Sequence, residues 1–96
     1  LITHSPPCGI LDQAEDDQKI GLAIPPYKIN KYCGSESLYQ ILYSELIRPK
    51  LHVFGHIHES YGHIPKMLDM PTTQFVNVSI MNGKYEPLNK PIRIEL

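Results

Sequence analysis

The sequence predicts an α/β fold, and three neighbouring segments carry that prediction. Residues 1–4 (Leu-Ile-Thr-His) are a short apolar strand candidate. Residues 38–47 place apolar side chains at helical spacing, and residues 51–54 (Leu-His-Val-Phe) form a second apolar strand candidate. A strand, a helix and a strand in that order indicate a crossover unit, which is typical of α/β proteins.

The first strand candidate ends at residues 5–7 (Ser-Pro-Pro), because prolines lack the N–H that a strand ladder needs. Residues 8–34 show no sustained period and are interrupted by glycines and prolines. A segment of this length without regular structure is either a functional, lid-like loop or a surface loop with no role, and both readings stay open.

The helix has two candidate N-caps. Ser37 stands three residues before Gln40 with the spacing of a capping box, and Ser35 is the alternative. We expect Pro49 to end the helix, because proline disfavours helical geometry in the residue before it. The helical stripe consists of Leu38, Ile41, Leu42, Leu46 and Ile47.

Four further extended segments are expected after the second strand candidate, at residues 61–64, 66–70, 73–79 and 91–95. Side chains alternate in character along residues 75–80, as in a strand that lies between two different environments. The tail alternates too, and because it begins with Pro91 it is expected to be an edge strand.

The composition limits the classes of function that can be expected. The chain has 96 residues, of which 42% are hydrophobic and 20% charged, so we expect one small globular domain. A net charge of −1 gives no reason to expect a nucleic-acid polymer or an anionic membrane as a partner. With no membrane-length apolar run, no leader, and only Cys8 and Cys33, we expect a reduced intracellular protein of the cytoplasm. Because residue 1 lies within a strand candidate, we also expect a piece of something larger.

Histidine carries the clearest chemical signal. His56 and His58 follow the second strand candidate directly, after Gly55. In an extended chain, residues i and i+2 project to the same side, so both rings could face one ion or two adjacent ions. His4 also stands at the end of a strand candidate, and neutral imidazole is a common ligand of divalent metals. We therefore interpret these three histidines as metal ligands rather than surface residues.

The other two histidines are interpreted differently. His52 lies within its strand, where a core histidine or one that supports a ligand is expected. His63 follows Gly62 on an exposed strand candidate and is expected to have no special role.

The two histidine motifs together resemble a known family. Residues 1–7 (Leu-Ile-Thr-His-Ser-Pro-Pro), then 9–12 (Gly-Ile-Leu-Asp), then 52–62 (His-Val-Phe-Gly-His-Ile-His-Glu-Ser-Tyr-Gly) are similar to the C-terminal half of calcineurin-like metallophosphoesterases. The nearest branch is that of the metallophosphoesterase-domain-containing proteins, which are similar to class III cyclic-nucleotide phosphodiesterases. The resemblance covers essentially the whole chain and implies that residues 1–96 are the C-terminal part of a four-layer α/β/β/α sandwich.

The resemblance also implies a centre of two divalent metal ions, manganese, iron, zinc or cobalt, that hydrolyses phosphodiesters. His4 and His56 match the two histidines that bind the second metal, and His58 matches a histidine ligand of the first. Asn77 and Glu59 are candidates for holding the other ring nitrogen of a ligating histidine. A phosphodiester or nucleotide is the expected ligand, with Tyr27 or Tyr61 available to stack on a base.

The sequence departs from the family in its first half. The Asp-x-His, Gly-Asp and Gly-Asn-His motifs do not occur here, so the aspartate that bridges the metals is missing. We expect the 96 residues to be inactive alone and to bind the N-terminal half of the domain or to self-associate. The alternative is a non-catalytic module, derived from the family, that binds a metal or a nucleotide.

Overall fold

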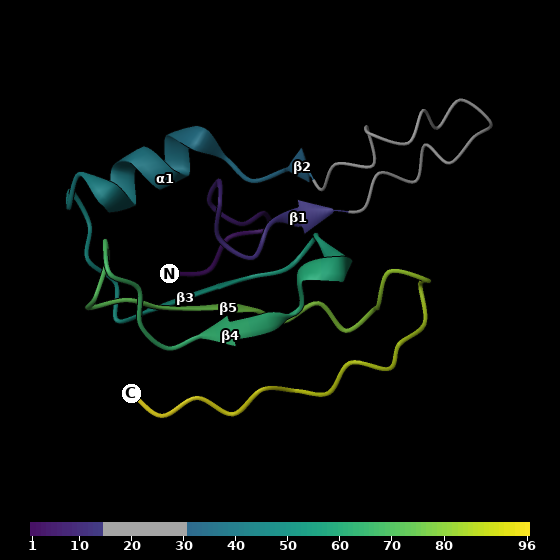
Figure 1. Ribbon diagram of the computed structural model, residues 1–96. Helices are drawn as coiled ribbons and strands as arrows, with labels where there is room; N and C mark the ends of the chain where they lie inside the picture. Colours follow the sequence, from purple (N-terminus) through teal and green to yellow (C-terminus); the bar gives the residue numbers. More distant parts are fainter. Residues whose placement is uncertain (15–30) are drawn as a thin grey trace.

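The computed structural model describes residues 1–14 and 31–96, with the Lys31 side chain excepted. Much of the expected loop at residues 8–34, including Tyr27, lies outside the described residues. The elements in chain order are β1 (Gln13–Ala14), β2 (Lys31–Tyr32), α1 (Glu36–Tyr43), β3 (Leu51–Phe54), the 3-10 turn η2 (His58–Ser60), β4 (Gly62–Ile64) and β5 (Gln74–Asn77) (Figure 1).

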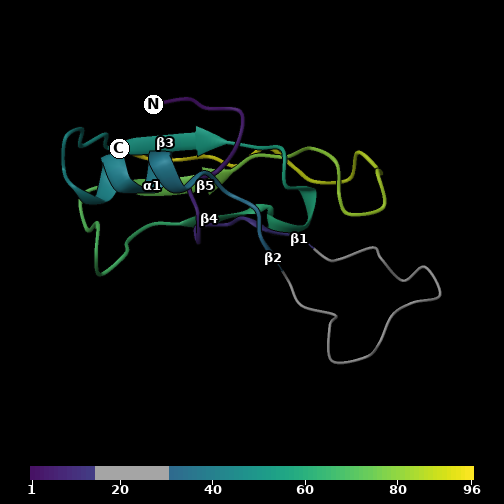
Figure 2. The same cartoon turned by 90° about the horizontal axis from the view of Figure 1, so that it is seen from above.

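The main sheet has the order β3-β5-β4. β3 pairs with β5 in parallel, with His52 opposite Phe75, and β4 pairs with β5 antiparallel. On the other side of β3, Ile2 forms an isolated parallel bridge with Val53, so the N-terminal segment runs along the free edge of β3 (Figure 2). The described residues therefore form a small α/β domain with a mixed sheet, as the sequence predicts.

The helix and the C-terminal segment lie on opposite faces of this sheet (Figure 1). Between the sheet and α1 is a core of buried side chains: Ile10, Leu42, Phe54, Met70 and Phe75. His52 and Phe54 are the buried residues of β3 and alternate with the half-buried Leu51 and Val53, which is the pattern of a strand with one well-covered face.

The N-cap of α1 is Ser35, the alternative of the two candidates. Its Oγ accepts a hydrogen bond from the Leu38 N–H at 3.1 Å, and Ser37 lies inside the helix. The capping box predicted at Ser37 is therefore wrong, because Ser35 already satisfies the free N–H of the first turn.

The helix ends at Tyr43, well before Pro49, so the predicted end is also wrong. The Ser44 hydroxyl donates to the Ile41 carbonyl at 3.0 Å, and Glu45 adopts a left-handed conformation with φ 64°. Leu46 is 77% exposed, so no packing favours continuing the helix through the second half of the stripe.

Two of the predicted extended segments contain strands and two do not. β4 and β5 lie within residues 61–64 and 73–79, whereas residues 66–70 and 91–95 form no strand. The tail is held by side chains instead of a strand ladder: the Gln74 Nε2 donates to the Glu95 carbonyl at 3.0 Å, and the Tyr61 hydroxyl donates to the Lys90 carbonyl.

Asp12 ties together the two segments that flank residues 15–30. Its Oδ2 accepts from the Gly9 N–H at 2.8 Å and from the Gly34 N–H at 2.9 Å. Pro7 and Ser35 are joined by a parallel bridge at the same place. A Cβ atom on Gly34 would lie 2.4 Å from the Pro7 carbonyl oxygen, so only glycine allows this approach.

Among the described residues, no helix is long and apolar enough to cross a membrane.

Substituting Gly34→Ala is therefore expected to lower the free energy of unfolding by about 1–3 kcal/mol, because the Pro7 backbone must move. Gly55→Ala is the matched control, since its Cβ would meet the Ser79 Oγ at an ordinary 3.4 Å. Urea denaturation of both variants measures the difference. Equal stability of the two variants would show that the approach of Gly34 to Pro7 does not constrain the fold.

Candidate metal centre

His4 and His56 come together although 52 positions separate them in the sequence. Their ring centroids lie 4.6 Å apart, with an angle of 44° between the ring planes. Each follows the end of one of two strands paired in parallel, so both histidines emerge at the same edge of the sheet. Carboxyl ends of parallel strands are where α/β proteins commonly place their ligands.

Backbone hydrogen bonds fix this arrangement at the strand ends. The Thr3 N–H donates to the Val53 carbonyl at 3.0 Å, and the Gly55 N–H donates to the His4 carbonyl at 3.0 Å. His56 is the next residue along the chain, so the pairing of the strands continues up to the two rings.

His56 occupies a strained turn rather than the extended chain expected from the sequence. Its φ is 68°, and the Ile57 N–H donates to the Gly55 carbonyl at 2.7 Å, which closes a three-residue turn around it. A residue other than glycine rarely adopts this conformation, which costs of order 1–3 kcal/mol and is concentrated at functional sites.

His58 contacts a different part of the chain from the other two histidines. It begins η2, and its ring packs edge-on against Tyr85 with centroids 5.3 Å apart. Within residues 1–14 and 31–96, no group of three or more His, Cys, Asp or Glu side chains is placed to hold a metal ion. The structure thus brings His4 and His56 together and leaves His58 apart, and its role as a ligand stays a prediction.

Asn77 supports the turn between His56 and His58. It is fully buried, and its Nδ2 donates to the Ile57 carbonyl at 2.8 Å and to the Leu11 carbonyl at 3.2 Å. Its Oδ1 accepts from the N–H and the hydroxyl of Ser79. These four contacts hold Asn77 in the framework around Ile57 and Ser79.

Glu59, the other candidate for supporting a ligand, lies in η2 on the exposed surface. A Cβ on Gly83 would meet the Glu59 Cγ at 3.1 Å, so η2 and the loop at residues 82–86 pack closely. The roles predicted for Asn77 and Glu59 toward a ligating histidine remain predictions.

His52 is a fully buried histidine, as predicted for its strand position. Its Nε2 lies 2.8 Å from the Thr3 Oγ1, and its ring packs edge-on against Phe54 and Phe75. Burial lowers the pKa of His52 to about 4. The imidazole is therefore neutral at pH 7.

Two residues near the histidines could not be singled out from the sequence. Thr3 is visible there only as part of the first motif, and its hydroxyl partner, His52, is 49 positions away. Tyr85 lies in a loop without periodicity, and nothing in the sequence pairs it with His58. Tyr61 donates its hydroxyl hydrogen to a carbonyl of the tail, and its predicted stacking on a base stays a prediction.

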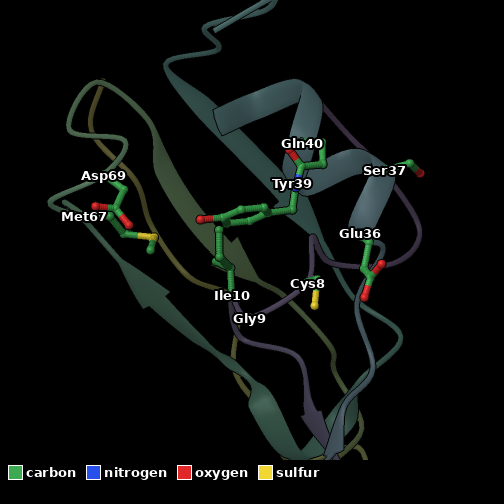
Figure 3. A pocket seen from close by; sticks show the side chains of 9 residues that line it. All are labelled: Cys8, Gly9, Ile10, Glu36, Ser37, Tyr39, Gln40, Met67 and Asp69. Atoms are coloured by element: carbon green, nitrogen blue, oxygen red, sulfur yellow. The ribbon is translucent and has the colours of Figure 1, made fainter. Parts of the chain in front are cut away.

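A separate pocket of about 760 Å³ lies beside the first half of α1 (Figure 3). No histidine lines it, and its rim carries the carboxylates of Glu36 and Asp69. Burial and the charges of Asp12 and Glu36 raise the pKa of the Cys8 thiol in its wall, so the thiol is protonated and a poor nucleophile at pH 7. This pocket is not part of the histidine centre.

The fold and the site define an α/β protein that presents a histidine pair at one sheet edge. Comparison with known proteins identifies sequences that are similar to this chain. No family model matches the chain. Over all 96 residues it is 38% identical to metallophosphoesterase domain-containing protein 1 of Homo sapiens and of Mus musculus, covering 24% of each relative. It is 32% identical over 96 residues to a UPF0046 protein of Caenorhabditis elegans, covering 20% of that relative.

The chain is thus similar along its whole length to metallophosphoesterase domain-containing proteins, which confirms the resemblance predicted from its motifs. It spans about a quarter of the length of these relatives.

The buried His52 predicts acid sensitivity. Its pKa is about 4 in the folded chain and about 6.5 when unfolded, so between these values only the unfolded chain binds the proton. The free energy of unfolding should therefore fall as the pH decreases from 6.5 to 4, by up to about 3 kcal/mol. Urea titrations across this range measure it. A His52→Phe variant shares the carboxylates but lacks the imidazole, and an identical pH dependence in it would contradict this account.

The strained turn predicts an order of stability at position 56. His56→Ala and His56→Gly both remove the imidazole, but only glycine adopts a positive φ without strain. We expect His56→Gly to be more stable than His56→Ala by about 1 kcal/mol, since the relieved strain exceeds the backbone entropy of glycine. Thermal unfolding of the two variants tests this, and an alanine variant of equal or greater stability would rule out strain at His56.

Proposed function

We propose that this chain contributes metal ligands to a metal-dependent phosphoesterase that hydrolyses phosphodiesters at a two-metal centre. The observation that carries the proposal is the contact between His4 and His56 at the ends of two paired strands. The names of the relatives support the reaction class, since they are metallophosphoesterase domain-containing proteins.

The donor set fits a divalent metal. His4 and His56 are both exposed, and neutral imidazole binds manganese, iron, zinc and cobalt. The strained turn at His56 holds its ring against His4 at a cost in stability, and a ligand that needs this geometry would explain the cost. His58, on the adjoining turn, is proposed as a ligand of the other metal.

A bound pair of divalent ions would neutralise charge on a phosphoryl group and supply the nucleophile. The chain's own part is to hold and orient the metal ligands. The strand pairing sets His4 and His56 side by side, and Asn77 fixes the carbonyl of Ile57 between His56 and His58. A phosphodiester or a nucleotide is the proposed ligand.

The remaining ligands are proposed to come from a partner half of the same domain, which would complete a four-layer α/β/β/α sandwich. Two features support this: the sequence lacks the family's N-terminal motifs, and Ile2, on the outermost strand, is 82% exposed. We therefore propose that the 96 residues are inactive alone, and that the complete enzyme works in the cytoplasm.

A second candidate function is a non-catalytic module that binds a metal or a nucleotide. It is favoured by one observation: the described residues bring two histidines together but form no group of three potential ligands. Binding without hydrolysis, even in the complete polypeptide, would select this candidate.

Calorimetric titration with Zn²⁺ and Mn²⁺ tests the histidine pair. We expect binding in the micromolar range and a loss of at least about 10-fold in affinity in His4→Ala and in His56→Ala, since even residues that only support a ligand contribute this much. His63→Ala is the matched control, because its Nε2 contacts Gln74 instead, and its affinity should not change. Affinity no tighter than about millimolar, or wild-type affinity in both variants, would contradict the assignment.

A further inference from the structure

We propose that Thr3 and His52 are positioning residues, which hold His4 against His56 through a partly buried chain of hydrogen bonds. The inference concerns the geometry of the pair and depends on the proposed function only for its metal readout. Neither residue is expected to touch a metal or a substrate.

The hydrogen bonds have a definite direction. The Thr3 Oγ1 donates to the Ser5 carbonyl at 2.7 Å, and a hydroxyl has only one hydrogen to give. At 2.8 Å from the His52 Nε2, the same oxygen must therefore accept, so the proton of His52 is assigned to Nε2. The chain runs from His52 through Thr3 to Ser5, and it closes the backbone around His4.

The second nitrogen of His52 explains why this residue matters. Its Nδ1 is buried and has no hydrogen-bond partner, which costs about 1–3 kcal/mol. A phenylalanine could make the same edge-on packing with Phe54 and Phe75, at 4.9 and 5.8 Å between ring centroids, without that cost. What only the histidine supplies is the Nε2–H that binds Thr3.

His4 is thus fixed from two sides. Its carbonyl accepts from the Gly55 N–H, which ties it to the residue before His56. The hydrogen bond between Thr3 and Ser5 restrains the turn on the other side, and His52 anchors that bond to the core. Removing the Thr3 hydroxyl leaves only the first restraint, so the His4 ring is expected to lose its defined position beside His56.

The test compares Thr3→Val, which loses the hydroxyl at nearly constant shape, with Thr3→Ser, which keeps it. His52→Phe removes the other partner and fills the same space. Thr73→Val is the matched control, because the Thr73 hydroxyl also makes a partly buried hydrogen bond to a backbone carbonyl, that of Pro49 at 2.6 Å, away from the histidine pair.

Two measurements are made on each variant. The first is the nuclear Overhauser effect between the rings of His4 and His56 in the metal-free chain, and the second is the affinity for Zn²⁺. In Thr3→Val and His52→Phe we expect the Overhauser effect to disappear and the affinity to fall about 10–100-fold. Thr3→Ser and Thr73→Val should keep both, although Thr73→Val loses stability.

The outcomes distinguish the positioning role of Thr3 and His52 from the proposed metal-binding function. An unchanged Overhauser effect and unchanged affinity in Thr3→Val and His52→Phe would overturn the inference, and so would an equal decrease in Thr73→Val, because general destabilisation would then explain it. If Thr3→Val does not fold, His52→Phe decides. If the Overhauser effect disappears in both variants and the wild type binds no Zn²⁺, the positioning role is supported and the proposed function is overturned.

Discussion

The parallel pairing of residues 1–3 with β3 is the contact on which the candidate centre depends. It joins chain segments about fifty residues apart and sets their ends at one edge of the sheet. α1 lies between these segments in the sequence and covers one face of the sheet, so the crossover that builds the core also brings His4 to His56. The same crossover topology therefore forms both the core and the candidate site.

Around this pairing, polar side chains hold the backbone where the sheet does not. Asn77 fixes the turn that follows His56, Asp12 joins the segments beside Gly9 and Gly34, and His52 anchors Thr3. Each is almost fully buried, and each makes at least one hydrogen bond to a residue twenty or more positions away in the sequence. Such buried groups are costly unless they are satisfied, and the Asp12 Oδ1 and the His52 Nδ1 are not.

The sequence predicted what local patterns control and missed what distant contacts control. Strand, helix and strand were visible as periodicities, and the convergence of His4 with His56 followed from two strand-end motifs. The turn at His56 was missed because a hydrogen bond of Asn77, twenty residues away, and the closure between Gly55 and Ile57 stabilise a φ that histidine rarely adopts. The early end of α1 was missed because the apolar stripe continues where nothing packs against it. The four-layer sandwich and the metal ligation rest on the family resemblance and are proposals.

The most direct test of the central claim is anomalous X-ray diffraction from crystals of this chain, or of a longer polypeptide that contains it, grown with Zn²⁺. The account predicts an anomalous peak about 2.0–2.1 Å from a ring nitrogen of His4 and of His56. A peak shared by these two rings would establish the strand-end pair as a metal site. A well-ordered structure in which zinc binds elsewhere, or in which the two rings point apart, would contradict the account.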